Sequence, residues 1–172
     1  PDMEFAIGGL LARSQLASGQ SEDAYHTIIT LREQFEEREL TRFFPNMDAM
    51  LCRMDLLTGD LDSAEEWYRR KAPKDLMNLN MMKRYQYFTQ AMVELTGGKT
   101  DAALLTLAPF EEYVQDCARY IDSIHLNVLT AIALYRKKDE SWQERFDMAL
   151  DTAEKYKFIR CISVYGGAVL PL

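Results

Sequence analysis

The chain has few of the residues that mark disulfide scaffolds, metal sites and membrane spans. Its 172 residues include two histidines, five prolines, eight glycines and three cysteines. Cys52, Cys117 and Cys161 are odd in number, widely spaced and without a Cys-x-x-Cys pair, which favours a reduced, cytoplasmic setting. No apolar run approaches the ~20 residues that a membrane span needs, and the N-terminus lacks the basic and apolar regions of a signal peptide.

Positive charge is also scarce. The net charge is −7, and phosphate binding needs clustered lysines and arginines, so nucleic acid is excluded as a direct partner. The densest basic stretch is Arg69-Arg70-Lys71, which follows Glu65-Glu66. We interpret this stretch as a solvated helix end.

Catalytic motifs are missing as well, so we predict no enzyme activity, no cofactor and no metal. Gly98-Lys99-Thr100 matches only the end of a phosphate-binding loop, because Val93 stands where that motif needs a glycine. Asp122 and His125 share a helical face, but no second pair of ligands accompanies them. No serine lies in a Gly-x-Ser-x-Gly motif.

The chain does contain a repeat of about forty residues. Leu-x-x-Gly followed five residues later by Ala occurs with its glycine at Gly19, Gly59 and Gly98, and a degenerate fourth copy ends at Lys137. A fixed period in this range is typical of stacked helix pairs. We therefore expect each glycine to form the hinge between two antiparallel helices.

Apolar residues recur at helical spacing almost everywhere. We expect helix N-caps at Ser21, Asp60, Thr100 and Asp139, and a kink or break of the sixth helix at Pro109. Residues 73–81 form the longest predicted loop. The predicted helices are 3–18, 21–38, 46–58, 61–71, 82–97, 100–117, 119–136, 140–156 and 158–165.

Alignment of the four copies on their hinges predicts how the helices pack. Small residues stand seven positions before each hinge, at Ala12, Cys52, Ala91 and Thr130. Small residues at that spacing allow close antiparallel packing. The predicted fold is all-α, a right-handed superhelix of antiparallel helix pairs, tetratricopeptide-like, with about four repeats of 39–40 residues in one domain spanning 1–172.

The same alignment predicts a concave binding groove. Side chains six, ten and thirteen residues before a hinge share a helical face away from the packing positions, and a neighbouring arginine lies beside it. We therefore expect a polar small molecule or a peptide of another protein to bind there, although the same long side chains would also simply cover an exposed face. The predicted groove residues are Arg13, Asn46, Arg53, Arg84, Tyr85, Phe88, Met92 and Asn127.

Three segments carry a family resemblance. They are Leu51–Ala64 followed by Trp67, the arginine–aromatic segment Arg84–Ala91, and the tail Ala149–Arg160 with Gly166–Leu172. Together with the long period, they resemble the repeat region of MalT-like, LuxR-type transcriptional regulators. In that family an ATP-binding module and a helix-turn-helix flank the repeats, which act as sensor and oligomerisation platform and in the maltose regulator take up the sugar inducer.

The resemblance implies that the chain is the effector-sensing and protein-interaction part of such a regulator. It implies self-association in the complete protein, and neither ATPase activity nor DNA binding by these residues. The chain starts without a methionine and ends in an apolar run, so we expect a piece excised from a longer protein. The alternative is a free-standing tetratricopeptide adaptor that holds a peptide segment of a partner protein.

Overall fold

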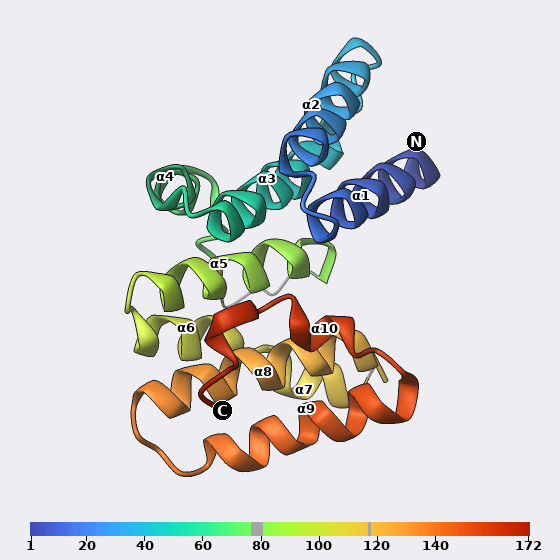
Figure 1. Cartoon of the computed structure of the whole chain (residues 1–172). Coiled ribbons are helices and arrows are strands. Elements are labelled where there is room, and N and C mark those ends of the chain that lie inside the picture. The colour runs from blue at the N-terminus through green and yellow to red at the C-terminus, as the bar shows by residue number, and fades with distance from the viewer. Residues whose placement is uncertain (77–80, 117) are drawn as a thin grey trace. The chain divides into compact units, whose positions relative to one another are not determined.

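Every regular element in the described part of the chain is a helix (Figure 1). The computed structural model describes residues 1–76, 81–116 and 118–172, so Cys117 and part of the predicted 73–81 loop lie outside the described residues. Among those described, no helix has the length and apolar character to cross a bilayer. The helices are α1 (Asp2–Ala17), α2 (Ser21–Glu37), η1 (Thr41–Phe43), α3 (Phe44–Thr58), α4 (Leu61–Lys71), η2 (Met81–Lys83), α5 (Arg84–Thr96), α6 (Thr100–Leu107), α7 (Phe110–Asp116), α8 (Tyr120–Arg136), α9 (Trp142–Tyr156), α10 (Arg160–Ser163) and η3 (Gly166–Ala168).

The hinges have the left-handed backbone that the repeat predicts. Gly19, Gly59 and Gly98 have φ of 79°, 88° and 73°. In the fourth copy the left-handed residue is Lys138, with φ 60°, whereas Lys137 has φ −82°. The fourth hinge was therefore predicted one residue too early. After each hinge, the next N–H donates to the carbonyl five residues earlier, in the pairs Gln20–Gln15, Asp60–Asp55, Lys99–Glu94 and Asp139–Leu134.

The corrected hinge improves the packing pattern. Seven residues before Lys138 stands Ala131, not Thr130, and it joins Ala12, Cys52 and Ala91 as a small residue that is at most 1% exposed. Small side chains are therefore buried at the same point of the first helix in all four pairs. Five residues after the first three hinges, the repeated alanines are buried too, at Ala24, Ala64 and Ala103.

The caps agree only in part with the predicted positions. Asp60 is the N-cap of α4, and its Oδ1 accepts the backbone N–H of Ser63 at 3.1 Å. Ser21 and Thr100 are the first residues of their helices, because the residues before them, Gln20 and Lys99, have the non-helical backbone of a cap. Asp139 lies before the cap of α9, which is Ser141.

Pro45 and Pro109 lie at helix ends, and the break at Pro109 was predicted. Pro45 lies in the first turn of α3, where its missing N–H costs no hydrogen bond. Pro109 separates α6 from α7, so the predicted sixth helix is divided into two.

The chain divides into two compact units, residues 1–73 and 74–172. In the first unit α1 packs on α2, α2 on α3 and α3 on α4. Its core includes Ile28, Phe35 and Met47, all fully buried, with Phe43 edge-on to Phe35 at a ring-centroid distance of 5.1 Å. That the whole chain forms one domain stays a prediction.

The second unit has its own core. There α5 packs on α6 and on α8, and α8 packs on α9. Phe110 lies at the centre, fully buried, and Tyr87 and Phe88 contact its ring at centroid distances of 5.7 and 4.8 Å. A core is therefore present on each side of residue 73.

Candidate functional site

Three of the predicted groove residues lie in the first unit. Arg13 on α1 is exposed, whereas Asn46 and Arg53 on α3 are half-buried. Arg13 and Arg53 each stand six residues before a left-handed glycine, so they occupy the same point of the repeat. Their equivalence is thus structural, and their contact with a ligand stays a prediction.

The other five lie in the second unit. At the start of α5, Arg84 and Tyr85 are half-buried, and the Arg84 Nε lies 3.3 Å from a carboxylate oxygen of Asp122. The same oxygen lies 2.6 Å from Nε of Arg119. Met92 is half-buried and packs against the core.

Phe88 and Asn127 are buried, at 2% and 3% exposed. The Asn127 amide is engaged on both sides, because its Oδ1 accepts from Arg145 at 3.2 Å and its Nδ2 donates to the Ser123 carbonyl at 3.0 Å. A ligand therefore reaches neither side chain unless a neighbour moves.

Asn127 was counted from Lys137, and the hinge is Lys138. Counting from Lys138 puts Val128 at the position that Phe88 holds in the third copy, and both side chains are buried, at 0% and 2% exposed. The displaced hinge is therefore not the reason why this position is buried.

The chain covers part of the predicted face with its own C-terminal segment, residues 158–172. Tyr165 in this segment is buried, and its hydroxyl lies 2.7 Å from the ring Nδ1 of His125 on α8. The His125 ring lies between those of Tyr165 and Phe88, at centroid distances of 5.8 and 6.0 Å. α10 packs on α8 and α9 (Figure 1). Phe88 therefore belongs to the same hydrophobic core as Tyr165 of the C-terminal segment.

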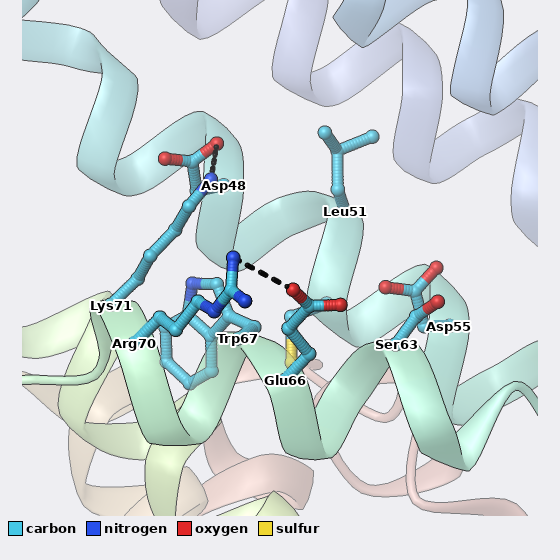
Figure 2. A pocket seen from close by; sticks show the side chains of 9 residues that line it. Asp48, Leu51, Asp55, Ser63, Glu66, Trp67, Arg70 and Lys71 are labelled. Atoms are coloured by element: carbon cyan, nitrogen blue, oxygen red, sulfur yellow. Dashed lines mark ion pairs between the residues drawn. The ribbon is translucent and has the colours of Figure 1, made fainter.

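A pocket of about 300 Å³ lies between α3 and α4 in the first unit (Figure 2). A volume of this size is at the lower end of the range for small-molecule sites. α3 contributes one wall and α4 the other, because close packing at Cys52 and Ala64 brings the two helices together below it. The lining residues are Asp48, Leu51, Cys52, Asp55, Ser63, Glu66, Trp67, Arg70 and Lys71.

One end of this pocket is rich in ion pairs. Asp48 accepts from Arg32 of α2 at 2.7 Å and lies 3.1 Å from the Lys71 ammonium. Arg70 pairs with Glu66 one turn earlier on α4, at 3.1 Å (Figure 2). Asp48 therefore has two cationic partners, whereas the Arg70–Glu66 pair stands mostly in solvent.

The other end holds a partly buried hydrogen bond. The hydroxyl of Tyr25 on α2 donates to the carboxylate of Asp55. Burial raises the pKa of Asp55, and burial together with this hydrogen bond raises the pKa of Tyr25 to about 12. Beside it, burial raises the pKa of the Cys52 thiol to about 12, so this thiol stays neutral and forms an apolar part of the wall.

Trp67 forms the floor of the pocket and is 6% exposed. Its indole Nε1–H has no acceptor among the described residues. Buried donors are nearly always paired, so an unpaired one is a feature that needs an explanation.

The α3–α4 pocket differs from the predicted groove. None of its lining residues was among the predicted groove residues, although Trp67 belongs to the segment that carries the family resemblance. The run Arg69-Arg70-Lys71 does end a helix in solvent, as predicted, with Arg70 and Lys71 side chains 66% and 51% exposed. The predicted antiparallel pairing of 46–58 with 61–71 already brings these cations beside the start of α3, but the spacing gives no sign of the space between the helices.

The histidine considered as a metal ligand has other partners. The ring of His125 contacts Tyr165, and Asp122 is paired with two arginines. Within residues 1–76, 81–116 and 118–172, no three histidine, cysteine, aspartate or glutamate side chains gather in a metal-binding group.

Comparison with known proteins agrees with the repeat. Neither curated proteins nor solved structures give a match. The family model of the MalT-like TPR region, where TPR stands for tetratricopeptide repeat, matches residues 1–172, the whole chain. The hinges and buried helix pairs described above are the structural form of such repeats. The chain therefore belongs to the family of MalT-like TPR regions.

Proposed function

We propose that the chain is the effector-sensing, protein-interaction and oligomerisation domain of a LuxR-type transcriptional regulator. The observation that carries this proposal is the match of the whole chain to the MalT-like TPR region. The helix pairs offer side chains for binding, and the net charge of −7 makes direct contact with DNA by these residues unfavourable. ATP hydrolysis and DNA reading belong, in this proposal, to other parts of the regulator.

Effector binding would act by changing how helix pairs pack. A ligand shifts an equilibrium only by the difference between its affinities for the two states, so it must contact side chains whose spacing changes. A ligand in the α3–α4 pocket would meet this condition if its binding changed the packing of the two helices, since residues of both line the pocket. A shift in packing within the pair would then bias self-association of the complete regulator.

The proposed setting is the cytoplasm. Cys52 is buried and forms no disulfide with any of the described residues. Free buried thiols persist where glutathione and thioredoxin keep proteins reduced.

The gene provides the first test. A coding sequence that continues beyond Leu172 into a helix-turn-helix supports the regulator. A stop codon directly after Leu172 contradicts it and favours the adaptor, which would hold a peptide of a partner protein.

A second test addresses sensing itself. A thermal-shift screen of small metabolites should yield at least one compound that raises the melting temperature, because ligands that bind only the folded state stabilise it. For a compound that binds in the predicted groove, calorimetry on Arg53→Ala should then show weaker binding at an unchanged melting temperature in the absence of ligand. Unchanged affinity would mean that the compound does not contact Arg53, as expected for a ligand of the α3–α4 pocket, which Arg53 does not line.

A further inference from the structure

The α3–α4 pocket has an excess of hydrogen-bond donors at one corner. The indole Nε1–H of Trp67 has no acceptor among the described residues, although the side chain is 94% buried. Figure 2 shows Arg70 and Lys71 at the same end of the pocket as the indole nitrogen. An indole, a guanidinium and an ammonium are donors only. Lys71 and Arg70 are paired with Asp48 and Glu66, so the indole N–H is the donor at this corner that still lacks an acceptor among the described residues.

The two cations can turn toward a ligand at little cost. Asp48 forms ion pairs with both Arg32, at 2.7 Å, and Lys71. If Lys71 turns toward a ligand, the pair with Arg32 still compensates the charge of Asp48. The Arg70–Glu66 pair is exposed, with side chains 66% and 54% accessible, and such pairs contribute little to stability. Exchange of these partners for a ligand's anionic group is thus feasible without unfolding either helix.

The pocket also has apolar side chains. Besides the indole ring, Leu51 and the Cys52 thiol line it. The thiol carries no charge at neutral pH, because burial raises its pKa to about 12. The site thus combines an apolar wall with a corner of donors.

We propose that this pocket binds a small organic carboxylate. The carboxylate would accept hydrogen bonds from the Trp67 Nε1–H, Arg70 and Lys71, and its aliphatic or aromatic body would lie against Leu51 and Cys52. Charge-assisted hydrogen bonds of this kind are shorter and stronger than neutral ones.

The acidic residues of the pocket do not prevent this binding. Asp48 remains paired with Arg32, and Asp55 accepts from Tyr25 at the end of the pocket away from Lys71 (Figure 2). Glu66 stands in solvent, where water and salt screen its charge.

This inference names a ligand class for the sensing role proposed above and rests on that role for its biological meaning. The binding itself is a property of this chain and is tested on it. If the chain does not bind a carboxylate, the proposed regulator can still be supported by a helix-turn-helix encoded downstream. If a stop codon follows Leu172, the measured affinity for a carboxylate is still valid.

The experiment is a titration of the isotopically labelled chain with hexanoate, followed through the indole N–H signals in proton–nitrogen spectra. Trp142 is the only other tryptophan, so Trp142→Phe assigns the two signals. We expect a saturable downfield shift of the Trp67 proton with the Trp142 signal unmoved. 1-Hexanol and hexylamine, which have the same chain and no carboxylate, should not produce it.

Variants of α4 identify the donors. Lys71→Gln and Arg70→Gln should each raise the dissociation constant about tenfold, the typical effect of losing a hydrogen bond to a charged group. Arg69→Gln is the matched control, because Arg69 is exposed on the same helix and does not line the pocket. A Trp67 signal that does not saturate in the millimolar range overturns the proposal. So does an equal shift with 1-hexanol, or an equal loss of affinity in Arg69→Gln.

Discussion

At the scale of single residues, the left-handed hinges are the positions where side-chain identity matters most. An L-residue other than glycine pays about 1–2 kcal/mol to adopt this conformation. Lys138 adopts it with φ 60°, so the fourth helix pair has the same hinge geometry as the other three. Its hinge carries this conformational strain, which the glycine hinges of the first three pairs do not.

Adjacent glycines allow a direct test of this cost. Gly98 has φ 73°, whereas Gly97 has φ −77°. Gly98→Ala should lower the free energy of unfolding by about 1–2 kcal/mol, and Gly97→Ala should leave it nearly unchanged. Lys138→Gly should raise it, by less than about 1 kcal/mol because glycine also gains freedom in the unfolded chain. Urea denaturation measures all three, and a stable Gly98→Ala would contradict the hinge assignment.

The Tyr25–Asp55 hydrogen bond predicts a specific loss of stability in alkali. The pKa of Tyr25 is raised in the folded protein from 10.0 to about 12. Its contribution to stability is therefore fully present below pH 10 and is lost as the pH rises toward 12, because the unfolded chain ionises first.

Tyr25→Phe should remove this part of the pH dependence. The variant should be less stable than the wild type below pH 10, since the hydrogen bond to Asp55 is gone, and the difference should shrink toward pH 12. Denaturation curves at several pH values give the result. The other eight tyrosines are common to both proteins and cancel in the comparison. A constant difference across this range would contradict the raised pKa.

At the scale of elements, the number and order of helices were predictable from the sequence, and their ends less so. Apolar periodicity located each helix, and Pro109 located the break between α6 and α7. The fourth hinge was displaced by one residue because Lys138 leaves no glycine to mark it. A backbone conformation that lacks its usual residue leaves no signal in the sequence.

The candidate site was less predictable than the fold. Counting from the hinges placed Arg13 and Arg53 in equivalent positions, but it could not reveal that Phe88 lies in the core. Burial depends on segments that are distant in the sequence, such as the C-terminal segment whose Tyr165 contacts His125, 40 residues earlier. The α3–α4 pocket, in contrast, lies between two consecutive helices, but the counting of hinge positions singled out none of its lining residues.

The C-terminal segment offers a test at this scale. Tyr165 is buried and bonded to His125, and Cys161 packs against the same core. Tyr165→Ala should release the segment, so that trypsin cleaves after Lys157 and Arg160 faster than in the wild type. Ser163→Ala is the control, because Ser163 lies in the same segment and is exposed. Equal cleavage rates in Tyr165→Ala and the wild type would contradict the docking.

At the scale of the whole molecule, the two cores predict separable stabilities. Phe35 belongs to the core of residues 1–73, and Phe110 to the core of residues 74–172. In repeat proteins each pair contacts mainly its neighbours, so damage stays local.

Cavity-forming substitutions test this separation. Phe35→Ala and Phe110→Ala should each cost about 3–5 kcal/mol, since both side chains are fully buried. Hydrogen exchange should show that Phe35→Ala lowers amide protection mainly in residues 1–73, and Phe110→Ala mainly in residues 74–172. Equal loss of protection throughout the chain in both variants would mean that the two units unfold as one.

The hinges also bear on how the protein is made. Each glycine joins a helix to the partner that follows it in the chain, and the first two pairs, α1–α2 and α3–α4, pack without residues from beyond position 73. Contacts between neighbouring segments form quickly, because little loop entropy opposes them. These pairs can therefore fold while the ribosome is still translating residues 74–172. Little apolar surface of residues 1–73 then stays exposed during synthesis.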